Sequence, residues 1–457
     1  MRRPLLALLI CLSTLPFLPS AFAQELSKQP LSVYSARRHA LADQLPSNGW
    51  VLLFAAEEPQ LDFDAYRQDP DFYYLTGWNE PGAALLIAAP TEAKDDHPAT
   101  PYREILFLPE RYLRFELYTG VKMDANTPDV TAKTGVAEVA PLARFSEVVV
   151  KEVLNGYRNR VYRGLSQQDS PQAVTTMNAL AVTLGMDKSP PFGDAHDQVM
   201  ALRSRKDEGE LALLKKAGDA SMTAQRAMMK SVKPGVTERD VQGIIVWKLL
   251  QNGCERVSYA PIVGSGPNST VLHYSANTRT MQSGDVVVVD AAGEFSMYAS
   301  DITRTVPVSG HFTDRQREIY NIVLGAQRAA AEAFVAGKFI MGDPNHRKPS
   351  DPPSLDRVAY DYINAHGKDL HGQPLGKYFI HGLGHSVGID VHDPIDYQKP
   401  LDKGMVFTIE PGIYIPEENL GVRIEDVFWV DKDGKLHDFI ADLPHTPEDV
   451  EAAMKAK

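Results

Sequence analysis

The chain has 457 residues, a length better suited to two domains than to one compact core. Hydrophobic residues make up 44% and charged residues 23% of it, as in an ordinary soluble globular protein. The formal net charge of −12, with no basic block along the chain, disfavours binding to nucleic acid or to anionic lipid.

Residues 1–23 differ in composition from the rest of the chain. Two arginines precede the apolar run Leu5–Leu12, and a small-x-small cleavage signal ends at Ala23, before Gln24. The apolar run is shorter than the ~20 residues that a membrane span needs, which disfavours an uncleaved anchor. These features predict a cleaved signal peptide and a secreted or periplasmic mature protein.

Cleavage would remove two positive charges and no negative ones, so the net charge would go from −12 to −14. Of the two cysteines only Cys254 would remain, so no intramolecular disulfide could form. The stability of the mature protein would then come from core burial and from bound metal. No second apolar stretch is long enough to span a membrane, so no span is predicted after cleavage.

Residues 31–195 are predicted to form an amino-terminal α/β domain. A helix is expected over Ala36–Gln44, and the aromatic-rich segment Arg67–Gly77 is predicted to be a strand and turn against the core. Gly185–Asp194 contains two adjacent prolines and is the predicted linker. Runs rich in β-formers predict strands at Val51–Phe54, Ala83–Ala89 and Glu104–Leu108.

Residues 196–457 are predicted to form the second domain. Its blocks of helices and strands indicate an α+β fold, in which helices cover a curved antiparallel sheet. Four prolines and several polar residues predict an exposed loop at Asp343–Pro353. Three helices are expected: one over Ser204–Lys230, one capped by Thr237 and Asp240, and one opened by the capping box Thr313-x-x-Gln316.

The stretch Val286–Val306 carries two carboxylates in a β-rich sequence. It starts with four valines, which favour a buried strand, and Gly293 and Glu294 supply a turn signal. Such a turn would fold the two halves antiparallel and bring Asp290 and Asp301 together. Because two buried carboxylates repel each other, we expect a cation between them. The alternative is that each aspartate bonds to backbone at a turn or strand end.

A short glycine-rich segment contains three histidines, His381, His385 and His392. This density is unusual for a structural loop, although any one of them alone would more often be a core residue. Gly382 stands where a helical H-E-x-x-H zinc motif has its glutamate, which excludes that motif. His273 follows another glycine-containing loop, which lacks the lysine of a phosphate-binding loop.

Two glutamates complete a set of four acidic residues at predicted strand ends. Glu410 ends a β-rich run, and Glu425 follows Arg423 on the next predicted strand. Four carboxylates carry a charge of about −4, which two divalent cations would neutralise. Oxygen-rich ligation with one imidazole favours Mn²⁺, Co²⁺ or Fe²⁺ over a thiolate-type zinc site. Two such ions roughly 4 Å apart can share a hydroxide and polarise a carbonyl, which indicates metal-assisted hydrolysis.

At these residues the chain resembles a known family. Residues 200–455 are similar to the metallopeptidases of the pita-bread fold, through S-D-I-T-R-T at 300–305 and T-I-E-P-G at 408–412. Residues 62–82 resemble the amino-terminal domain of Xaa-Pro aminopeptidases (aminopeptidase P) and of the related prolidases. The segment 338–380 is shorter and more proline-rich than in that family, so the resemblance does not define the pocket rim there.

The resemblance implies a role for each residue that matches the family's motifs. The metal ligands would be Asp290, Asp301, His385, Glu410 and Glu425. A metal-bridging hydroxide would be the nucleophile, and Glu410 would manage its proton. His381 and His392 would assist the tetrahedral intermediate and the prolyl group, and Arg423 would orient polar groups of the substrate. His273, His381, His392 and Arg423 would surround the substrate.

The function that follows is an exported aminopeptidase with two divalent ions, most simply Mn²⁺, acting on peptides with proline in the second position. A Xaa-Pro dipeptidase (prolidase) stays open, because the histidine motif serves both activities. Outside the enzymes, a metal-free peptide-binding module is the other alternative, although such relatives lack ligands that are present here. We expect a homo-oligomer, with a number of subunits that the sequence leaves open.

Overall fold

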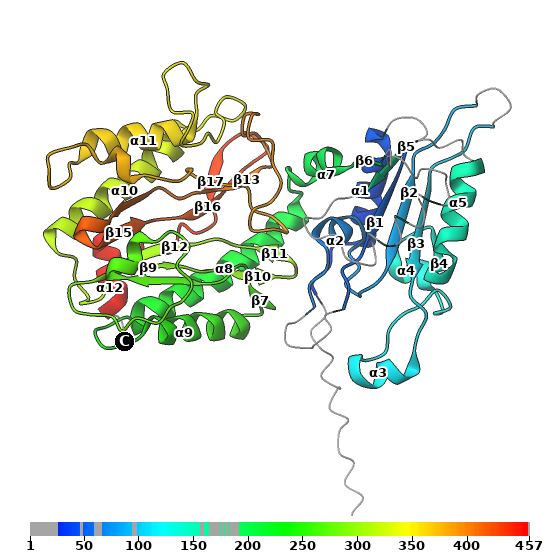
Figure 1. Ribbon diagram of the computed structural model, residues 1–457, viewed down its shortest axis with the longest axis horizontal. Coiled ribbons are helices and arrows are strands. Elements are labelled where there is room, and N and C mark those ends of the chain that lie inside the picture. Colours follow the sequence, from blue (N-terminus) through cyan, green and yellow to red (C-terminus); the bar gives the residue numbers. More distant parts are fainter. Residues whose placement is uncertain are drawn as a thin grey trace, which may run out of the picture.

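The computed structural model describes the chain from Leu26 to Lys455 with several gaps. The predicted signal peptide and most of the predicted linker lie outside the described residues. The last three residues of that linker form a strand. The described residues are 26–45, 49–58, 66–93, 98–155, 160–163 and 192–455, together with Thr175, Asn178 and Val182. Figure 1 shows two halves, and the carboxy-terminal half contains the larger set of elements.

The amino-terminal half is built on a six-stranded sheet with the order β4-β3-β2-β1-β5-β6. Strands β1, β2 and β3 pair antiparallel, whereas β4, β5 and β6 join in parallel. The strands span β1 Gly49–Phe54, β2 Ala84–Ala88, β3 Arg103–Leu108, β4 Glu138–Pro141, β5 Arg160–Arg163 and β6 Phe192–Asp194. The helices span α1 Leu31–Gln44, α2 Pro70–Thr76, α3 Leu113–Thr119, α4 Val130–Thr134 and α5 Phe145–Asn155, with a 3₁₀ turn η1 at Leu142–Arg144.

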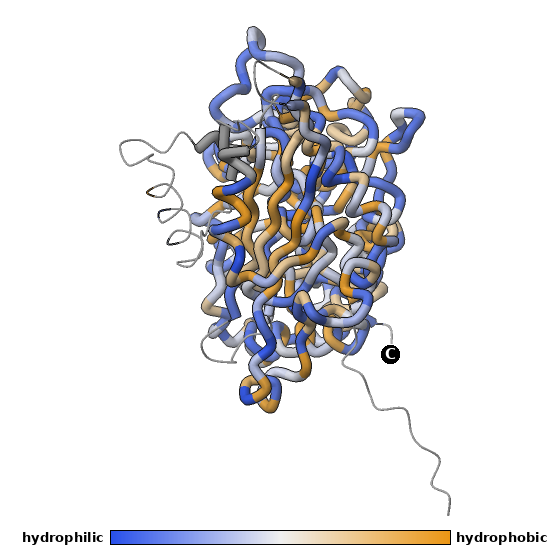
Figure 2. Tube along the Cα trace, turned by 90° about the vertical axis from the view of Figure 1, so that its right-hand side faces the viewer, coloured by the Kyte–Doolittle hydropathy of each residue, from blue (hydrophilic) through white to orange (hydrophobic). Residues whose placement is uncertain are grey.

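The central strands of this sheet are buried on both faces. Along β1, Val51 and Leu53 face the large core cluster, whereas Trp50 and Leu52 pack on the other side with Phe145 and its neighbours. This alternation is the period-2 geometry of a strand, and it explains why these strands read as continuous apolar runs. In Figure 2, which faces this half, the hydrophobic residues run along the middle strands.

The prediction of a strand and turn for Arg67–Gly77 is wrong, because Pro70–Thr76 forms helix α2. Asp69 caps the helix by accepting a hydrogen bond from Phe72 N, and a proline occupies its first position. Gly77 ends it in the left-handed conformation, with φ of 61°. The aromatic density misled the prediction, since all seven helical residues are at least half-buried and no polar face marks the helical period.

The carboxy-terminal half contains two pairs of helices that enclose several small sheets. Helices α8 and α9 lie on one side of the strands and α10 and α11 on the other (Figure 1). The helices span α7 His196–Arg203, α8 Glu208–Ser231, α9 Glu238–Gln251, α10 Asp314–Ala333, α11 Leu355–His366 and α12 Pro447–Lys455. The 3₁₀ turns span η2 Gly266–Thr270, η3 Leu375–Tyr378 and η4 Pro416–Glu418.

Every strand pair described in this half is antiparallel, as expected for the predicted α+β fold. The sheets have the orders β12-β9-β8, β11-β10-β7, β13-β16-β17 and β14-β15. The first two groups of strands span β7 Arg256–Val257, β8 Ile262–Ser265, β9 Val286–Asp290, β10 Gly293–Phe295, β11 Tyr298–Ala299 and β12 Thr303–Pro307. The others span β13 Val406–Ile409, β14 Gly412–Ile415, β15 Leu420–Arg423, β16 Asp426–Val430 and β17 Leu436–Asp438.

The two-carboxylate stretch folds back antiparallel as predicted, with Asp290 on β9 opposite Thr303 on β12. The turn, however, lies at Ser296 and Met297 and not at Gly293 and Glu294, which belong to β10. Both turn residues have positive φ, 49° for Ser296 and 74° for Met297. Non-glycine residues rarely adopt this conformation, so their sequence gave no turn signal.

The predicted caps of two helices are confirmed. Thr237 with Asp240 and Thr313 with Gln316 each form a complete capping box, at the start of α9 and α10. Helix α8 begins at Glu208, four residues later than predicted, because Asp207 caps it. No helix among the described residues is long and apolar enough to cross a membrane.

A buried group of charges connects the two halves. Arg203, at the end of α7, donates to Asp71 Oδ1 on α2 at 2.6 Å and to Asp393 Oδ1 at 2.5 Å. Lys206 donates to the other oxygen of Asp393 at 2.9 Å. All four side chains are buried. Asp393 directly follows His392, so these ion pairs hold one end of the histidine segment against the amino-terminal half.

Candidate active site

Strand ends in the carboxy-terminal half bring the four predicted carboxylates into one region. Asp290 is the last residue of β9, and Asp301 lies between β11 and β12. Glu410 follows β13, and Glu425 lies between β15 and β16. A bridge between Thr303 and Glu425 joins the two pairs, and Thr303 Oγ1 donates to Glu425 Oε2 at 2.7 Å.

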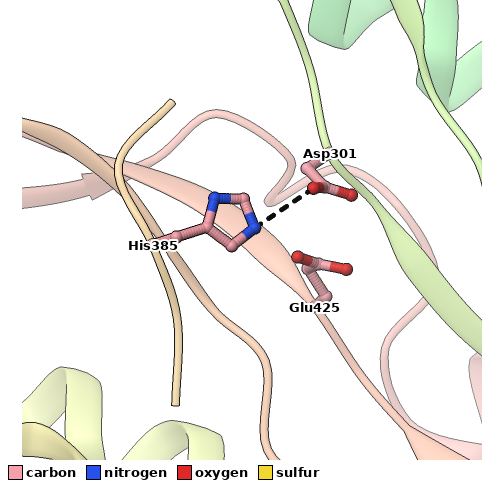
Figure 3. A group of neighbouring side chains, drawn as sticks. All are labelled: Asp301, His385 and Glu425. Carbon is pink, nitrogen blue, oxygen red and sulfur yellow. Dashed lines mark ion pairs between the residues drawn. The ribbon is translucent and has the colours of Figure 1, made fainter. Parts of the chain in front are cut away.

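Asp301, His385 and Glu425 converge, with their ligand atoms within 4.8 Å of one another (Figure 3). The Nε2 atom of His385 lies 3.4 Å from Asp301 Oδ2 and 3.4 Å from Glu410 Oε1. His385 Nδ1 lies 3.1 Å from the carbonyl oxygen of Ser386, which orients the ring so that Nε2 faces the carboxylates. Four of the five predicted ligands thus meet around one imidazole nitrogen.

Asp290 joins this group through a tyrosine that the sequence analysis missed. The hydroxyl of Tyr259 lies 2.5 Å from Asp290 Oδ1 and 2.5 Å from Asp301 Oδ1. Arg423 donates to the other oxygen of Asp290 at 2.6 Å. The loop between β7 and β8 carries Tyr259, where an aromatic residue is most simply interpreted as core, so no sequence signal marked it.

The carboxylates lack enough positive charge among the described residues. Burial, followed by repulsion from Asp290, raises the pKa of Asp301. Burial, then the charge of Asp301, raises the pKa of Glu425 well above its usual range. Burial also raises the pKa of Glu410, to about 7, although His385 opposes the shift. Within the described chain Glu425 Oε1 has no hydrogen-bond partner and is buried.

These observations fit divalent cations at the site. A buried carboxylate oxygen without a partner is costly, and a metal ion supplies both the charge and the missing bond. Burial alone would lower the pKa of His385, but its hydrogen bond to Asp301 and the charge of Glu410 raise it to about 9. Without metal, the protonated ring of His385 therefore supplies a positive charge in the place that a cation would take. The donor set of oxygens with one imidazole suits Mn²⁺, Co²⁺ or Fe²⁺.

His381 points away from this group, towards Tyr414 and Arg423. Its Nε2 atom lies 2.9 Å from the hydroxyl of Tyr414, which accepts a hydrogen bond from Arg423 Nη1 at 2.8 Å. Burial and the positive charge of Arg423 lower the pKa of His381 to about 3, so the ring is neutral at physiological pH. Tyr414, on β14, is a second residue that the sequence analysis missed.

The two remaining predicted histidines are exposed. The ring of His392 stacks on that of His385, with centroids 3.9 Å apart. Burial, then the charge of His385, lowers the pKa of His392 to about 4. His273 lies close enough for its charge to lower the pKa of both His381 and His392. Exposed His273 and His392 and half-buried His381 therefore lie close to one another beside the acidic group.

A second group of metal-ligand type lies next to the first, formed by Asp426, Asp438 and His445. It differs because a buried arginine already occupies it. Arg304 donates to Asp426 Oδ1 at 2.7 Å, and both side chains are fully buried. His445 Nε2 lies 2.7 Å from Asp426 Oδ2. Burial would raise the pKa of Asp426, but Arg304 and then His445 lower it to about 2.

Comparison with known proteins agrees with this geometry. The sequence profile of metallopeptidase family M24 matches residues 212–432, and that of the aminopeptidase P N-terminal domain matches residues 34–162. The Xaa-Pro aminopeptidase of Escherichia coli is 32% identical over 456 residues, covering 94% of this chain and 99% of the relative.

Solved structures agree as well. Proline aminopeptidase P II from Yersinia pestis has a TM-score of 0.79 at 29% identity, covering 93% of this chain and 99% of that one. Zinc-substituted aminopeptidase P of Escherichia coli in complex with product has a TM-score of 0.79 at 30% identity, covering 94% and 99%. These likenesses define the class as a metallo-exopeptidase with a pita-bread domain that binds divalent metal. The chain belongs to the aminopeptidase P family of the M24 metallopeptidases.

Proposed function

We propose that this protein is an exported Xaa-Pro aminopeptidase, which removes the first residue from peptides with proline in the second position. The whole-length likeness to the Escherichia coli Xaa-Pro aminopeptidase carries the proposal, together with the convergence of Asp301, His385 and Glu425. Metal-free binding relatives lack ligands at the matching positions, whereas this chain has all five. The likeness therefore supports an enzyme and not a binding module.

In this proposal two divalent ions are held by Asp290, Asp301, His385, Glu410 and Glu425. When bound, the ions would supply a hydroxide nucleophile at neutral pH and would polarise the scissile carbonyl. Tyr259 fixes the two aspartates relative to each other through its hydrogen bonds. His385 is kept in the tautomer with Nε2 towards the carboxylates by the Ser386 carbonyl group.

Glu410 would take and return the proton of the nucleophile. Burial raises its pKa to about 7 when no metal is bound, and the charge of bound cations would lower it, so Glu410 would be ionised and able to accept a proton. Glu410 is held by Thr408 Oγ1, which donates to Glu410 Oε1 at 3.1 Å. A fixed carboxylate next to the ligand imidazole can accept the proton and later pass it to the leaving proline nitrogen.

His381, His392, His273 and Arg423 would bind the substrate around this centre. In neutral His381, Nδ1 donates to the carbonyl oxygen of Gly382, so Nε2 accepts from the hydroxyl of Tyr414. On substrate binding that hydroxyl would turn to donate to the oxygen that becomes negative in the tetrahedral intermediate. Arg423 supplies a permanent positive charge on the same side. Exposed His273 and His392 would contact the prolyl part of the substrate.

The choice of metal and location are part of the same proposal. Mn²⁺ is proposed because the donor set is rich in oxygen and contains no sulfur, and Co²⁺ or Fe²⁺ would also fit it. Export is proposed from the composition of residues 1–23. Amino-terminal sequencing of the native protein should return Gln24, and Met1 at the amino terminus would contradict export.

Activity on substrates of different length tests the function. The Mn²⁺-loaded protein should release the first residue from a tripeptide with proline second, and chelation should abolish this activity until Mn²⁺ or Co²⁺ is returned. Preference for a Xaa-Pro dipeptide over the tripeptide would make the protein a dipeptidase instead. Full activity in metal-stripped protein, or no cleavage of either peptide, would contradict the proposed hydrolase.

A further inference from the structure

The loop Asp343–Pro353 is predicted to be exposed, but the side chain of Arg347 within it is largely buried. The side chain of Arg347 is only 10% exposed, whereas that of His346 is 66% exposed and Lys348 is also exposed. The loop itself forms no helix or strand. A long charged side chain turned inwards from such a loop needs specific partners to offset its desolvation.

The guanidinium of Arg347 has an acidic anchor on one side. Its Nε atom donates to Asp356 Oδ1 at 2.5 Å and its Nη2 atom to Asp356 Oδ2 at 3.0 Å. Asp356 is fully buried in the first turn of α11. A two-point contact of this kind fixes both the position and the plane of the guanidinium.

The rest of the guanidinium is directed at the backbone that carries His381. Nη1 donates to the carbonyl oxygen of Phe379 at 3.0 Å, and Nη2 donates to the carbonyl oxygen of His381 at 2.9 Å. The guanidinium also lies 4.4 Å from the centre of the Phe379 ring and 4.8 Å from that of Tyr360. The Phe379 ring in turn meets the His381 ring edge-to-face, with centroids 5.3 Å apart.

The backbone at His381 belongs to no regular element. It lies beyond η3, which ends at Tyr378, and well before β13, which begins at Val406. Among the described residues no strand pairs with the peptide groups of Phe379 and His381, and the hydrogen bonds from Arg347 fix them instead. The ring of His381 is then aimed by its contact with the Tyr414 hydroxyl.

We infer that Arg347 is a positioning residue for His381, connecting the proline-rich loop to the active site through the carbonyl groups of Phe379 and His381. Only the expected change in kcat rests on the proposed function, whereas the positioning of His381 by Arg347 does not. The loop thus contributes to the site through the backbone that carries His381.

The test uses full-length protein loaded with Mn²⁺ and two variants at this position. Arg347→Lys keeps a positive charge for Asp356 but has no planar fork to reach both carbonyl groups, so it should fold. Arg347→Ala removes all contacts and serves as the second variant. Lys348→Ala, which removes a neighbouring exposed charge, is the matched control and should behave as the wild type.

The expected kinetic result is specific for His381. Arg347→Lys should lower kcat by about 10- to 100-fold with an unchanged metal content, because small misplacements of a group in the site have effects of this size. In a His381→Ala background the same change should alter kcat less than about twofold, since the residue that Arg347 positions is gone. Equal losses in both backgrounds, or no loss in the wild-type background, would overturn the inference.

A readout without turnover separates this inference from the proposed function. Labelling by diethyl pyrocarbonate, read by mass spectrometry, should rise severalfold at His381 in Arg347→Lys while that of His445 stays unchanged. If the wild type cleaves no Xaa-Pro peptide, the proposed function fails and the labelling alone decides. Unchanged labelling at His381, or an equal rise at both histidines, would reject a positioning role.

Discussion

Glu425 and Asp426 are neighbours in the sequence and both buried, yet they lie in two groups with opposite electrostatics. Glu425 faces Asp301 and His385, and its pKa is raised well above the usual range by burial and by Asp301. Asp426 faces Arg304 and His445, and these two neighbours lower its pKa to about 2 against the effect of burial. Successive residues of an extended backbone point to opposite sides, so the chain at the start of β16 supplies one residue to each group.

The difference shows what a metal centre needs beyond suitable residue types. Both groups contain two carboxylates and a histidine within 4.8 Å. In the Asp426 group an arginine of the protein already balances the charge and donates to Oδ1 of Asp426, whereas Gln327 donates to Oδ2, so both oxygen atoms have partners. In the Glu425 group one carboxylate oxygen has no partner within the described chain. The first arrangement stabilises the fold, and the second is open to a cation.

The largest effect is expected when the histidine of the Glu425 group, His385, is replaced by alanine, and His445 of the Asp426 group serves as the comparison. His385→Ala should lose bound metal, and turnover should fall by more than about 10⁴-fold, beyond the loss of a single acid–base group. His445→Ala should keep its metal and most of its activity. Metal content per chain, measured together with turnover, checks both. If only His445→Ala lost metal, the metal site would be the Asp426 group and not the Glu425 group.

His381→Ala should affect chemistry without affecting metal. The imidazole bonds to Tyr414 and not to the carboxylates, so metal content should stay close to that of the wild type. Turnover should fall by about 10²- to 10⁴-fold, the usual size of an acid–base or intermediate-stabilising contribution. If this variant lost metal while His385→Ala retained it, the assignments of the two histidines would be exchanged.

Arg304→Ala should lower the stability of the fold and leave metal binding by the folded protein intact. Removing one partner of a fully buried ion pair leaves Asp426 unpaired, which costs about 3–5 kcal/mol in the free energy of unfolding. Chemical denaturation measures this loss, and at low denaturant the folded fraction should still bind metal. Unchanged stability, with loss of metal, would show that Arg304 belongs functionally to the Glu425 group.

The smallest effect concerns pH. Burial, then repulsion from Asp426, raises the pKa of Asp438 to about 8. An acid whose pKa is raised on folding stabilises the protein at low pH, and this contribution disappears as pH rises from about 4 through 8. Asp438→Asn should therefore gain in melting temperature relative to the wild type as the pH is raised from 5 to 9. Parallel melting curves at all pH values would contradict the assignment.

The sequence predicted the parts of this molecule that have local signals. The valine run became β9, and two capping boxes began α9 and α10, because these patterns act within a few residues. Helix α2 and the turn at Ser296 and Met297 were missed. The first is buried on every side, and the second adopts positive φ without a glycine.

The same limit applies to the site. The acidic residues and histidines could be selected from the sequence because their chemistry is distinctive, and the family resemblance put them in order. Tyr259 and Tyr414 could not, since a tyrosine looks like any core aromatic until its hydroxyl is placed between two carboxylates or beside a histidine. Arg347 was hidden for a similar reason, because its partners lie on α11 and at His381.

The buried charges around Arg203 bear on whether the protein can be divided. Arg203 pairs with Asp71 from the amino-terminal half and with Asp393 beside the histidine segment. A catalytic half expressed by itself would leave this guanidinium without one of its carboxylates and would open a buried face. The amino-terminal half is therefore not a detachable accessory. Exchanging it between relatives would require Asp71 and Arg203 to be transferred together.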